Sequence, residues 1–337
     1  MAHTRHALVV SLSSTCADCK NIHEKNVHEG GRGKGVEAPP IERISRDREL
    51  PLSFAQQRLW FIQQLEPDRV AYNMPIEVSL RGDLNVAALA QSISEILRRH
   101  EVLRTRFVSQ NGRPRQEIVE PTAVEVSFWD LSGLRDAGEA EKYGRKLVDQ
   151  EGRRPFNLEL GPAVRTALVR LGPNEHILFV CLHHVVSDGW STRVLVREFG
   201  ALYDSSRQGR VSGLKELPVQ YADFAVWQRE WLKGDVMEVE LGYWRSQLAG
   251  ITALDMPVDR PRRGDSRHLG ANLGFRLAAE LTAGLKEVSR REGASLFMTV
   301  LTAFQMVLSR YTGQEDIVVG TEVANRNRLE TEREAAP

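Results

Sequence analysis

Apolar and polar positions alternate with two different periods along the middle of the chain. The stretch YNMPIEVSLRG (72–82) alternates well enough to predict a strand, whereas LNVAALAQSISEILRRH (84–100) repeats apolar residues on one helical face. Two strands are expected on either side of Asn111-Gly112, a dipeptide that favours a tight hairpin turn. A further amphipathic helix is expected to end before Pro155. Together these elements predict an α+β unit.

Two more strands are expected between residues 163 and 184, joined by a turn at Gly172-Pro173. The segment 177–182 is apolar without alternation, which is typical of a central strand covered on both faces. Helical spacing of apolar residues begins after Gly189. The pair His183-His184 therefore lies at the carboxyl end of a strand and directly before a helix, where ligand crevices form in α/β architectures.

Changes of composition divide the chain into three zones. Residues 1–45 lack periodicity and are expected to be a disordered leader and linker. Residues 46–232 are expected to form a first lobe, and residues 233–337 a partial second lobe with a polar tail. Within that second lobe, SLFMTVLTAFQMVLSRYTG (295–313) predicts a core helix with an N-cap at Ser295.

Overall composition narrows the class of protein. The 337 residues are 42% hydrophobic and 27% charged, which is typical of a globular protein. Lys+Arg and Asp+Glu both number 45, and this balance argues against nucleic acid or an anionic membrane surface as a partner. No apolar run is long enough to span a bilayer, and the first residues do not resemble a signal peptide. Three cysteines are too few for a disulfide framework, so we expect a cytoplasmic protein.

The segment CLHHVVSDGW (181–190) carries the candidate chemistry. Adjacent side chains in extended backbone point to opposite faces, so His183 and His184 do not suit a shared metal ion. One imidazole, His184, is expected to face a crevice and the other the packed interior. Asp188 is either a helix N-cap or a functional carboxylate, and Gly189 suggests a close backbone approach or an unusual backbone conformation.

A second group of candidate metal ligands lies in the leader. Cys16, Cys19, His23 and His28 follow the pattern C-x2-C-x3-H-x4-H, and these side chains suit tetrahedral zinc. The gap between the cysteines and the histidines is far shorter than in a zinc finger, and no apolar core surrounds them. No metal site is therefore predicted.

Four stretches, and in part a fifth, resemble the motifs of one family and follow in the same order along the chain. LHHVVSDGWS (182–191) resembles the HHxxxDG signature of the condensation domains of nonribosomal peptide synthetases, which belong to the chloramphenicol-acetyltransferase-like superfamily. LSFAQQRLWF (52–61), RHEVLRTRF (99–107) and YADFAVWQ (221–228) resemble the first, second and fourth motifs of these domains. DIVVGTEVANRNRLETE (316–332) resembles the approach to the fifth motif. The resemblance covers roughly residues 48 to 332.

This resemblance implies a two-lobed α/β (α+β) chloramphenicol-acetyltransferase-like fold with a complete N-terminal lobe and a truncated C-terminal lobe. The family continues with a motif resembling GFFVNT and with further strands, whereas this chain stops at Pro337. The family's carrier domain often precedes the linker, but residues 1–36 hold no LGGxS-like site. Because unpaired strand edges would remain, we expect the chain alone to be inactive and its second lobe to be cleaved first by proteases.

The resemblance also implies an activity and its residues. Such a domain is a peptide-bond-forming enzyme that joins a carrier-bound aminoacyl or peptidyl thioester to the amine of a carrier-bound amino acid. It implies that His184, the second histidine of the pair, accepts the amine proton or orients the amine, and both roles stay open. It pairs Asp188 with a late arginine, matched here by Arg326 in preference to Arg328. Backbone N–H groups near Gly189 would stabilise the oxyanion.

No intrinsic cofactor is implied, because the substrates are carried on phosphopantetheine arms of donor and acceptor carrier domains, with an adenylation domain adjacent. Two motifs look most like the subtype that joins an L-configured donor to an L-configured acceptor. Two other functions stay open: an incomplete fragment that only binds carrier protein, and a coenzyme A-dependent acyltransferase, which shares HxxxD. The flanking motifs favour the condensation domain.

The remaining motif residues are assigned structural roles. Arg99, His100 and Arg104 lie at a helix–strand junction and are expected to stabilise the lobe by satisfying helix-end carbonyls. Trp227, Trp231 and Trp244 are expected to pack in the core or between the lobes.

Overall fold

The computed structural model describes residues 38–259 and 273–321, which fall into two compact units. Described residues up to Lys233 form one unit, and those from Gly234 onward belong to the other. The predicted pairing residues Arg326 and Arg328 lie outside the described residues. The same holds for the four leader side chains considered for zinc: Cys16, Cys19, His23 and His28.

The first unit begins at Ala38, earlier than the expected lobe boundary at residue 46. Ile41 is buried with 5% exposure, and the N–H of Ile44 donates to Asp223 at 3.0 Å. Trp227 donates from its indole to the Pro39 carbonyl at 2.8 Å. Residues 38–45 are thus packed against helix α6 (Tyr221–Trp231) rather than forming a free linker.

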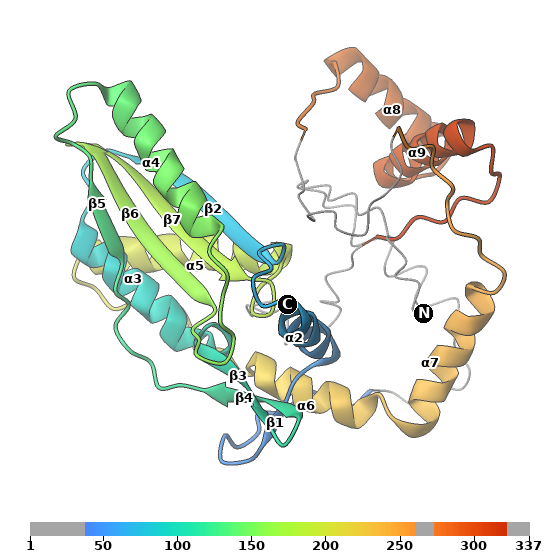
Figure 1. Ribbon diagram of the computed structural model, residues 1–337, viewed down its shortest axis with the longest axis horizontal. Coiled ribbons are helices and arrows are strands. Elements are labelled where there is room, and N and C mark those ends of the chain that lie inside the picture. The colour runs from blue at the N-terminus through green and yellow to red at the C-terminus, as the bar shows by residue number, and fades with distance from the viewer. Residues whose placement is uncertain (1–37, 260–272, 322–337) are drawn as a thin grey trace. The chain divides into compact units, whose positions relative to one another are not determined.

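A four-stranded sheet forms the centre of this unit (Figure 1). Its strand order is β2-β7-β6-β5, with antiparallel pairing except between β5 and β6, which run parallel. The strands are β2 (Asn73–Arg81), β7 (Glu175–His183), β6 (Val164–Gly172) and β5 (Ser127–Asp130). The expected turn at Gly172-Pro173 joins β6 to β7 and is confirmed.

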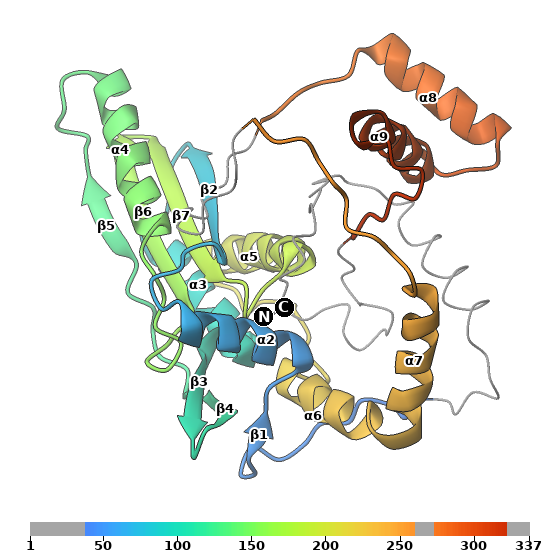
Figure 2. The same cartoon turned by 45° about the vertical axis from the view of Figure 1, so that its right-hand side comes forward.

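Helices cover both faces of this sheet (Figures 1 and 2). Helix α4 (Ala137–Gly152) lies on one face, and α3 (Val86–Arg99) and α5 (Gly189–Arg207) lie on the other. On β7, Ile177 belongs to the main core with Val148 of α4, whereas Leu178 packs with Leu89 of α3. Successive residues of β7 are therefore buried on opposite faces, which confirms the central strand predicted from its unbroken apolar run.

Helix α4 approaches the sheet closely at Gly144. A Cβ atom at that position would lie 3.2 Å from the Val169 side chain and 3.1 Å from the Leu171 side chain. The absence of a side chain thus lets the helix backbone come nearer to β6 than an alanine would allow.

A second, smaller sheet has the order β1-β4-β3. Its strands are β1 (Leu50–Pro51), β4 (Arg113–Ile118) and β3 (Thr105–Gln110). Asn111 and Gly112 join β3 to β4 with φ values of 54° and 74°. Two positive φ values at the turn are those of a type I′ hairpin, which confirms the turn predicted from the Asn-Gly pair.

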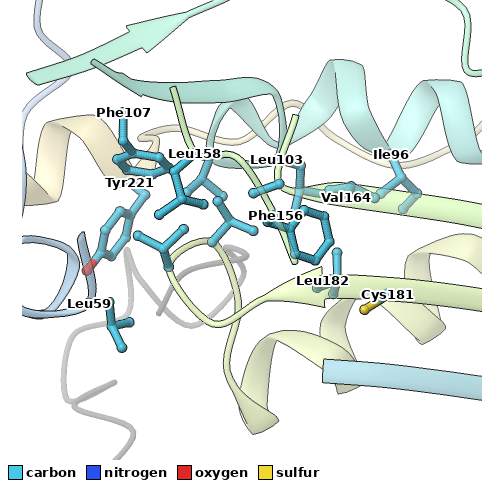
Figure 3. Packing of buried hydrophobic residues seen from close by; sticks show 14 of the residues in the cluster. Leu59, Ile96, Leu103, Phe107, Phe156, Leu158, Val164, Cys181, Leu182 and Tyr221 are labelled. Carbon is cyan, nitrogen blue, oxygen red and sulfur yellow. The ribbon is translucent and has the colours of Figure 1, made fainter. Parts of the chain in front are cut away.

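The main hydrophobic core draws on segments that are far apart in the sequence (Figure 3). Leu59 comes from α2 (Phe54–Leu65), Phe107 from β3, Leu182 from β7 and Tyr221 from α6. Each of these side chains is at most 5% exposed. The core therefore holds three of the resembling stretches next to the end of β7.

A buried ion pair links α3 to α5. Arg99 is 3% exposed, and its guanidinium donates to both carboxylate oxygens of Glu198 at 3.1 and 3.2 Å. His100 Nε2 lies 2.9 Å from the same carboxylate. Burial acts to raise the pKa of Glu198, but the hydrogen bonds from His100 and Arg99 outweigh it and lower the pKa to about 2. Arg99 and His100 thus stabilise the lobe chiefly by binding the Glu198 carboxylate, a partner that was not predicted from the sequence.

The second unit contains α7 (Gly234–Gln247), α8 (Ala279–Arg291) and α9 (Leu296–Thr312). The Ser295 hydroxyl caps α9 by accepting from the Met298 N–H, which confirms the predicted start of this helix. Leu308 alone among the described residues of α9 is buried, so the predicted core helix buries less than expected. In the part of the chain that the structure describes, no single helix could cross a membrane; α8 and α9 pass the length and composition test only together, across a 106° bend.

Replacing Glu198 by Gln should lower the free energy of unfolding by about 3–5 kcal/mol, because Arg99 would keep a buried charge without its counter-ion. The matched control is Glu216→Gln, whose carboxylate pairs with Arg98 at the surface. That change should cost no more than about 0.5 kcal/mol. Urea unfolding of both variants measures the difference; equal losses would contradict a stabilising role for the buried pair.

Candidate active site

The candidate site lies where β7 ends and α5 begins. Hydrogen bonds from both neighbouring segments fix the main chain there: His183 N–H donates to the Ala163 carbonyl at 3.0 Å, and His184 N–H donates to the Tyr72 carbonyl at 2.8 Å. Val186 N–H closes the turn on the His183 carbonyl at 3.0 Å. His184 therefore follows directly on a strand whose last residues are held from both sides.

The two adjacent imidazoles have different surroundings, as the alternation of strand side chains predicts. His183 is fully buried, and its ring centroid lies 5.9 Å from that of Phe156 and 6.2 Å from that of Tyr72. His184 is half-buried. Within the described ranges, no group of three or more His, Cys, Asp or Glu side chains could hold a metal ion.

His183 acts as a fixed, neutral part of the turn. Its Nδ1 accepts from the Val185 N–H at 3.0 Å, which assigns the ring proton to Nε2. Burial lowers the pKa of His183 to about 4, and the charges of His184 and Arg165 act in the same direction. The lone pair on Nδ1 is already used and the ring stays neutral at neutral pH, so His183 supports the main chain rather than exchanging protons with a substrate.

Asp188 is the N-cap of α5. One carboxylate oxygen accepts from the Ser191 N–H at 2.7 Å and from the Ser191 hydroxyl at 2.6 Å. The capping role, which the sequence left as one of two possibilities, is therefore present.

Gly189 differs from the expectation. It is the exposed first residue of α5, its φ is not among the positive values, and an added Cβ would meet no heavy atom of the described residues within 4 Å. Within the described part of the chain, neither a close backbone approach nor an unusual conformation requires glycine there.

Sequence reasoning missed Gln56, which lies against the turn. Helix α2 begins with Ser53 as N-cap, and Gln56 completes a capping box by accepting the Ser53 N–H at 3.1 Å. The other end of the same amide reaches the Val185 carbonyl at 3.5 Å. Gln56 is fully buried. The Ser-x-x-Gln spacing in LSFAQQRLWF was the available signal, because it marks a polar side chain turned back toward its own helix start.

Helix α6 holds the start of α2 in place. Tyr221 donates from its hydroxyl to Ser53 Oγ at 2.8 Å, and Gln228 accepts from the Phe54 N–H at 2.9 Å. Arg229 donates to the Leu52 carbonyl at 2.8 Å, and its guanidinium lies 4.0 Å from the centre of the Phe54 ring. The resembling stretches 52–61, 182–191 and 221–228 thus meet through direct contacts in one unit.

Comparison with known proteins identifies the family. The family model for the condensation domain matches residues 46–335, so the chain belongs to the condensation domain family. It is 45% identical over 299 residues to a part of linear gramicidin synthase from Brevibacillus parabrevis. It is 42% identical over 289 residues to the phosphinothricin tripeptide synthetase of Streptomyces viridochromogenes. These alignments cover 88% and 86% of this chain but only 4% and 26% of the two relatives.

Solved structures show the same fold. The X-domain from teicoplanin biosynthesis matches with a TM-score of 0.78 at 28% identity, over 89% of this chain and 66% of that one. The first condensation domain of the CDA synthetase matches with a TM-score of 0.66 at 24% identity, over 86% of this chain and 68% of that one. The predicted chloramphenicol-acetyltransferase-like α/β architecture is thereby confirmed.

The lowered pKa of His183 predicts a pH dependence of stability. Between about pH 6.5 and pH 4 the unfolded chain binds a proton at this ring and the folded chain does not, so the free energy of unfolding falls as pH falls through this window. His183→Asn keeps an acceptor near Nδ1 and removes the titration. The wild-type protein should lose up to about 3 kcal/mol more than this variant between neutral pH and about pH 4. Urea unfolding at a series of pH values tests this; parallel curves for the two proteins would disprove it.

Proposed function

We propose that this domain forms an amide bond between an aminoacyl or peptidyl thioester on one carrier protein and the amine of an aminoacyl thioester on a second. The observation that carries the proposal is the half-buried His184, which follows a fixed strand end in the HHxxxDG segment of a condensation domain family member. One of the relatives is itself named a tripeptide synthetase, and this chain spans about a quarter of its length.

The chemistry requires one proton to move and one thiol to leave. The amine nitrogen attacks the thioester carbonyl carbon, a C–N bond forms, the C–S bond breaks and the donor's pantetheine thiol departs. A neutral imidazole with an ordinary pKa of about 6.5 can accept the amine proton at neutral pH or orient the amine by a hydrogen bond. Holding both tethered reactants beside one another supplies a further part of the acceleration.

Two features of α5 support a role in stabilising the oxyanion. The helix begins five residues after His184, and its N-terminus carries the positive end of the helix dipole. No atom of the described residues occupies the place of a side chain at Gly189 in this first turn, so none of them blocks a substrate carbonyl from approaching the main chain there. The proposed substrates would arrive on phosphopantetheine arms of donor and acceptor carrier domains, loaded by an adenylation domain, in the cytoplasm.

His184→Ala should lower the rate of dipeptidyl-carrier formation by about 100-fold or more, because the group that accepts or orients the amine proton is lost. The assay uses loaded carrier proteins and the polypeptide at its full natural length. His176→Gln is the control, because His176 lies at the opposite end of β7, away from the turn, and is more deeply buried than His184. A folded His184→Ala protein that condenses within a few-fold of the wild-type rate would overturn the assignment.

We further propose that Asp188 forms an ion pair with Arg326, in preference to Arg328, in addition to capping α5. The half-buried position of the carboxylate supports this, because a carboxylate removed from water is stabilised by a cation. The two bonds to Ser191 converge on one carboxylate oxygen. Since an ionised carboxylate accepts at about four lone-pair sites, the same group can cap the helix and accept from a guanidinium at once.

Asp188→Asn separates the two roles, because asparagine caps a helix as well as aspartate does but carries no charge. The ion pair predicts a loss of more than about 1 kcal/mol of unfolding free energy, rising toward 3–5 kcal/mol with complete burial. The matched control is Asp136→Asn at the exposed N-cap of α4, which should change stability by less than about 0.5 kcal/mol. If both variants lose the same small amount of unfolding free energy, Asp188 caps the helix and forms no stabilising ion pair.

A further inference from the structure

We propose that Gln56 is a positioning residue for His184, acting through the peptide groups of Val185. This inference rests on the proposed function, in which His184 meets the acceptor amine. Gln56 belongs to the first resembling stretch, whose residues otherwise serve as packing, and it touches the candidate site from outside the four-stranded sheet.

Val185 lies directly after His184 and is fully buried, so its main-chain polar groups are bonded within the protein. Its N–H is taken by His183 Nδ1 at 3.0 Å, and its carbonyl receives the side-chain amide of Gln56 at 3.5 Å. His183 thus supports one side of Val185 and Gln56 the other. Gln56 belongs to α2, so its contact comes from a separate helix, whereas the contact from His183 comes from the end of β7 itself.

The Gln56 amide has a defined orientation. Its oxygen accepts the Ser53 N–H at 3.1 Å, which leaves both amide hydrogens on the opposite side. These face the Val185 carbonyl and the Gln116 Oε1, which lies at 3.4 Å. Gln116 in turn donates to the Pro51 carbonyl at 2.8 Å. A flipped amide would bring oxygen against oxygen at two places, so the network fixes the donor toward Val185.

These bonds hold the main chain of the turn that follows His184. The His184 N–H is held by the Tyr72 carbonyl and the Val185 N–H by His183 Nδ1. The peptide group between Val185 and Val186 is held twice, by Gln56 at its carbonyl and by the His183 carbonyl at its N–H. Loss of the Gln56 contact leaves the peptide group between Val185 and Val186 held at its N–H alone, so the turn can shift and displace the His184 imidazole. A displacement on the order of 1 Å at a reacting group lowers a rate by up to about 100-fold.

The test compares Gln56→Met with Gln220→Met. Methionine matches glutamine in length and removes the hydrogen bonds. Gln220 is a matched control because its buried amide also bridges main-chain groups, the Glu101 N–H at 3.0 Å and the Arg99 carbonyl at 2.8 Å, away from residues 183–186. Both variants are examined by urea unfolding, by NMR of ¹⁵N-labelled histidine side chains assigned with His184→Ala, and by kcat and KM for condensation.

Gln56→Met should shift the His184 imidazole signals and lower kcat about tenfold, with the KM for the loaded carrier unchanged. Gln220→Met should lose comparable stability and leave both readouts at wild-type values. His184 signals and kcat within twofold of wild type in folded Gln56→Met protein would overturn the proposal. If His184→Ala proves active, the proposed function fails, but the NMR comparison still decides whether Gln56 positions the ring.

A second variant covers the case in which Gln56→Met does not fold. Gln56→Glu keeps the length and the acceptor for the Ser53 N–H, and its carboxyl can donate to the Val185 carbonyl only when protonated. The His184 signals of this variant should depart from those of the wild type at high pH and approach them as the introduced carboxyl is protonated. Signals that match the wild type at every pH would overturn the proposal.

Discussion

A strand that ends inside a protein must satisfy its last main-chain hydrogen bonds without water, and this constraint shapes the region around His184. The residues after β7, Val185 and Val186, are fully buried. Their peptide groups therefore depend on His183 and Gln56, while the carbonyls of Ala163 and Tyr72 hold the main chain of His183 and His184 just before them. The half-buried imidazole of His184 projects from a backbone with little freedom to move.

The same constraint explains why distant stretches of sequence converge here. Gln56 can reach the turn only if the first turn of α2 is held, and Tyr221, Gln228 and Arg229 of α6 hold it. These contacts between α6 and the start of α2 thus help to place one amide group. The chemistry proposed for the domain uses few side chains. Many more residues of the first unit are needed to hold those side chains in position.

The sequence predicted local features well, because hairpins, central strands and helix caps are set by residues close together in the chain. Asn111-Gly112 requires a turn with positive φ, and the unbroken apolar run before His183 requires cover on both faces. The partners of buried polar groups were not predictable in this way. Glu198 looked like an ordinary helix residue, and only the packing of α3 on α5 brings Arg99 and His100 to it. Gly189 was expected for a backbone reason that the helix does not require, and residues 38–45 looked like linker although Ile41 is buried.

That early segment has a mechanical consequence for any polypeptide joined ahead of it. The Pro39 carbonyl and the Ile44 N–H are both bonded to α6, and Arg46 binds Asp223 and Glu101. Any upstream partner is therefore tethered no later than Pro39, a fixed place on the domain, rather than near residue 46. A tether shortened in this way searches a smaller volume, since the mean span of a flexible chain grows with the square root of its length. The local concentration at which such a partner meets the domain is set by this anchorage as much as by any contact surface.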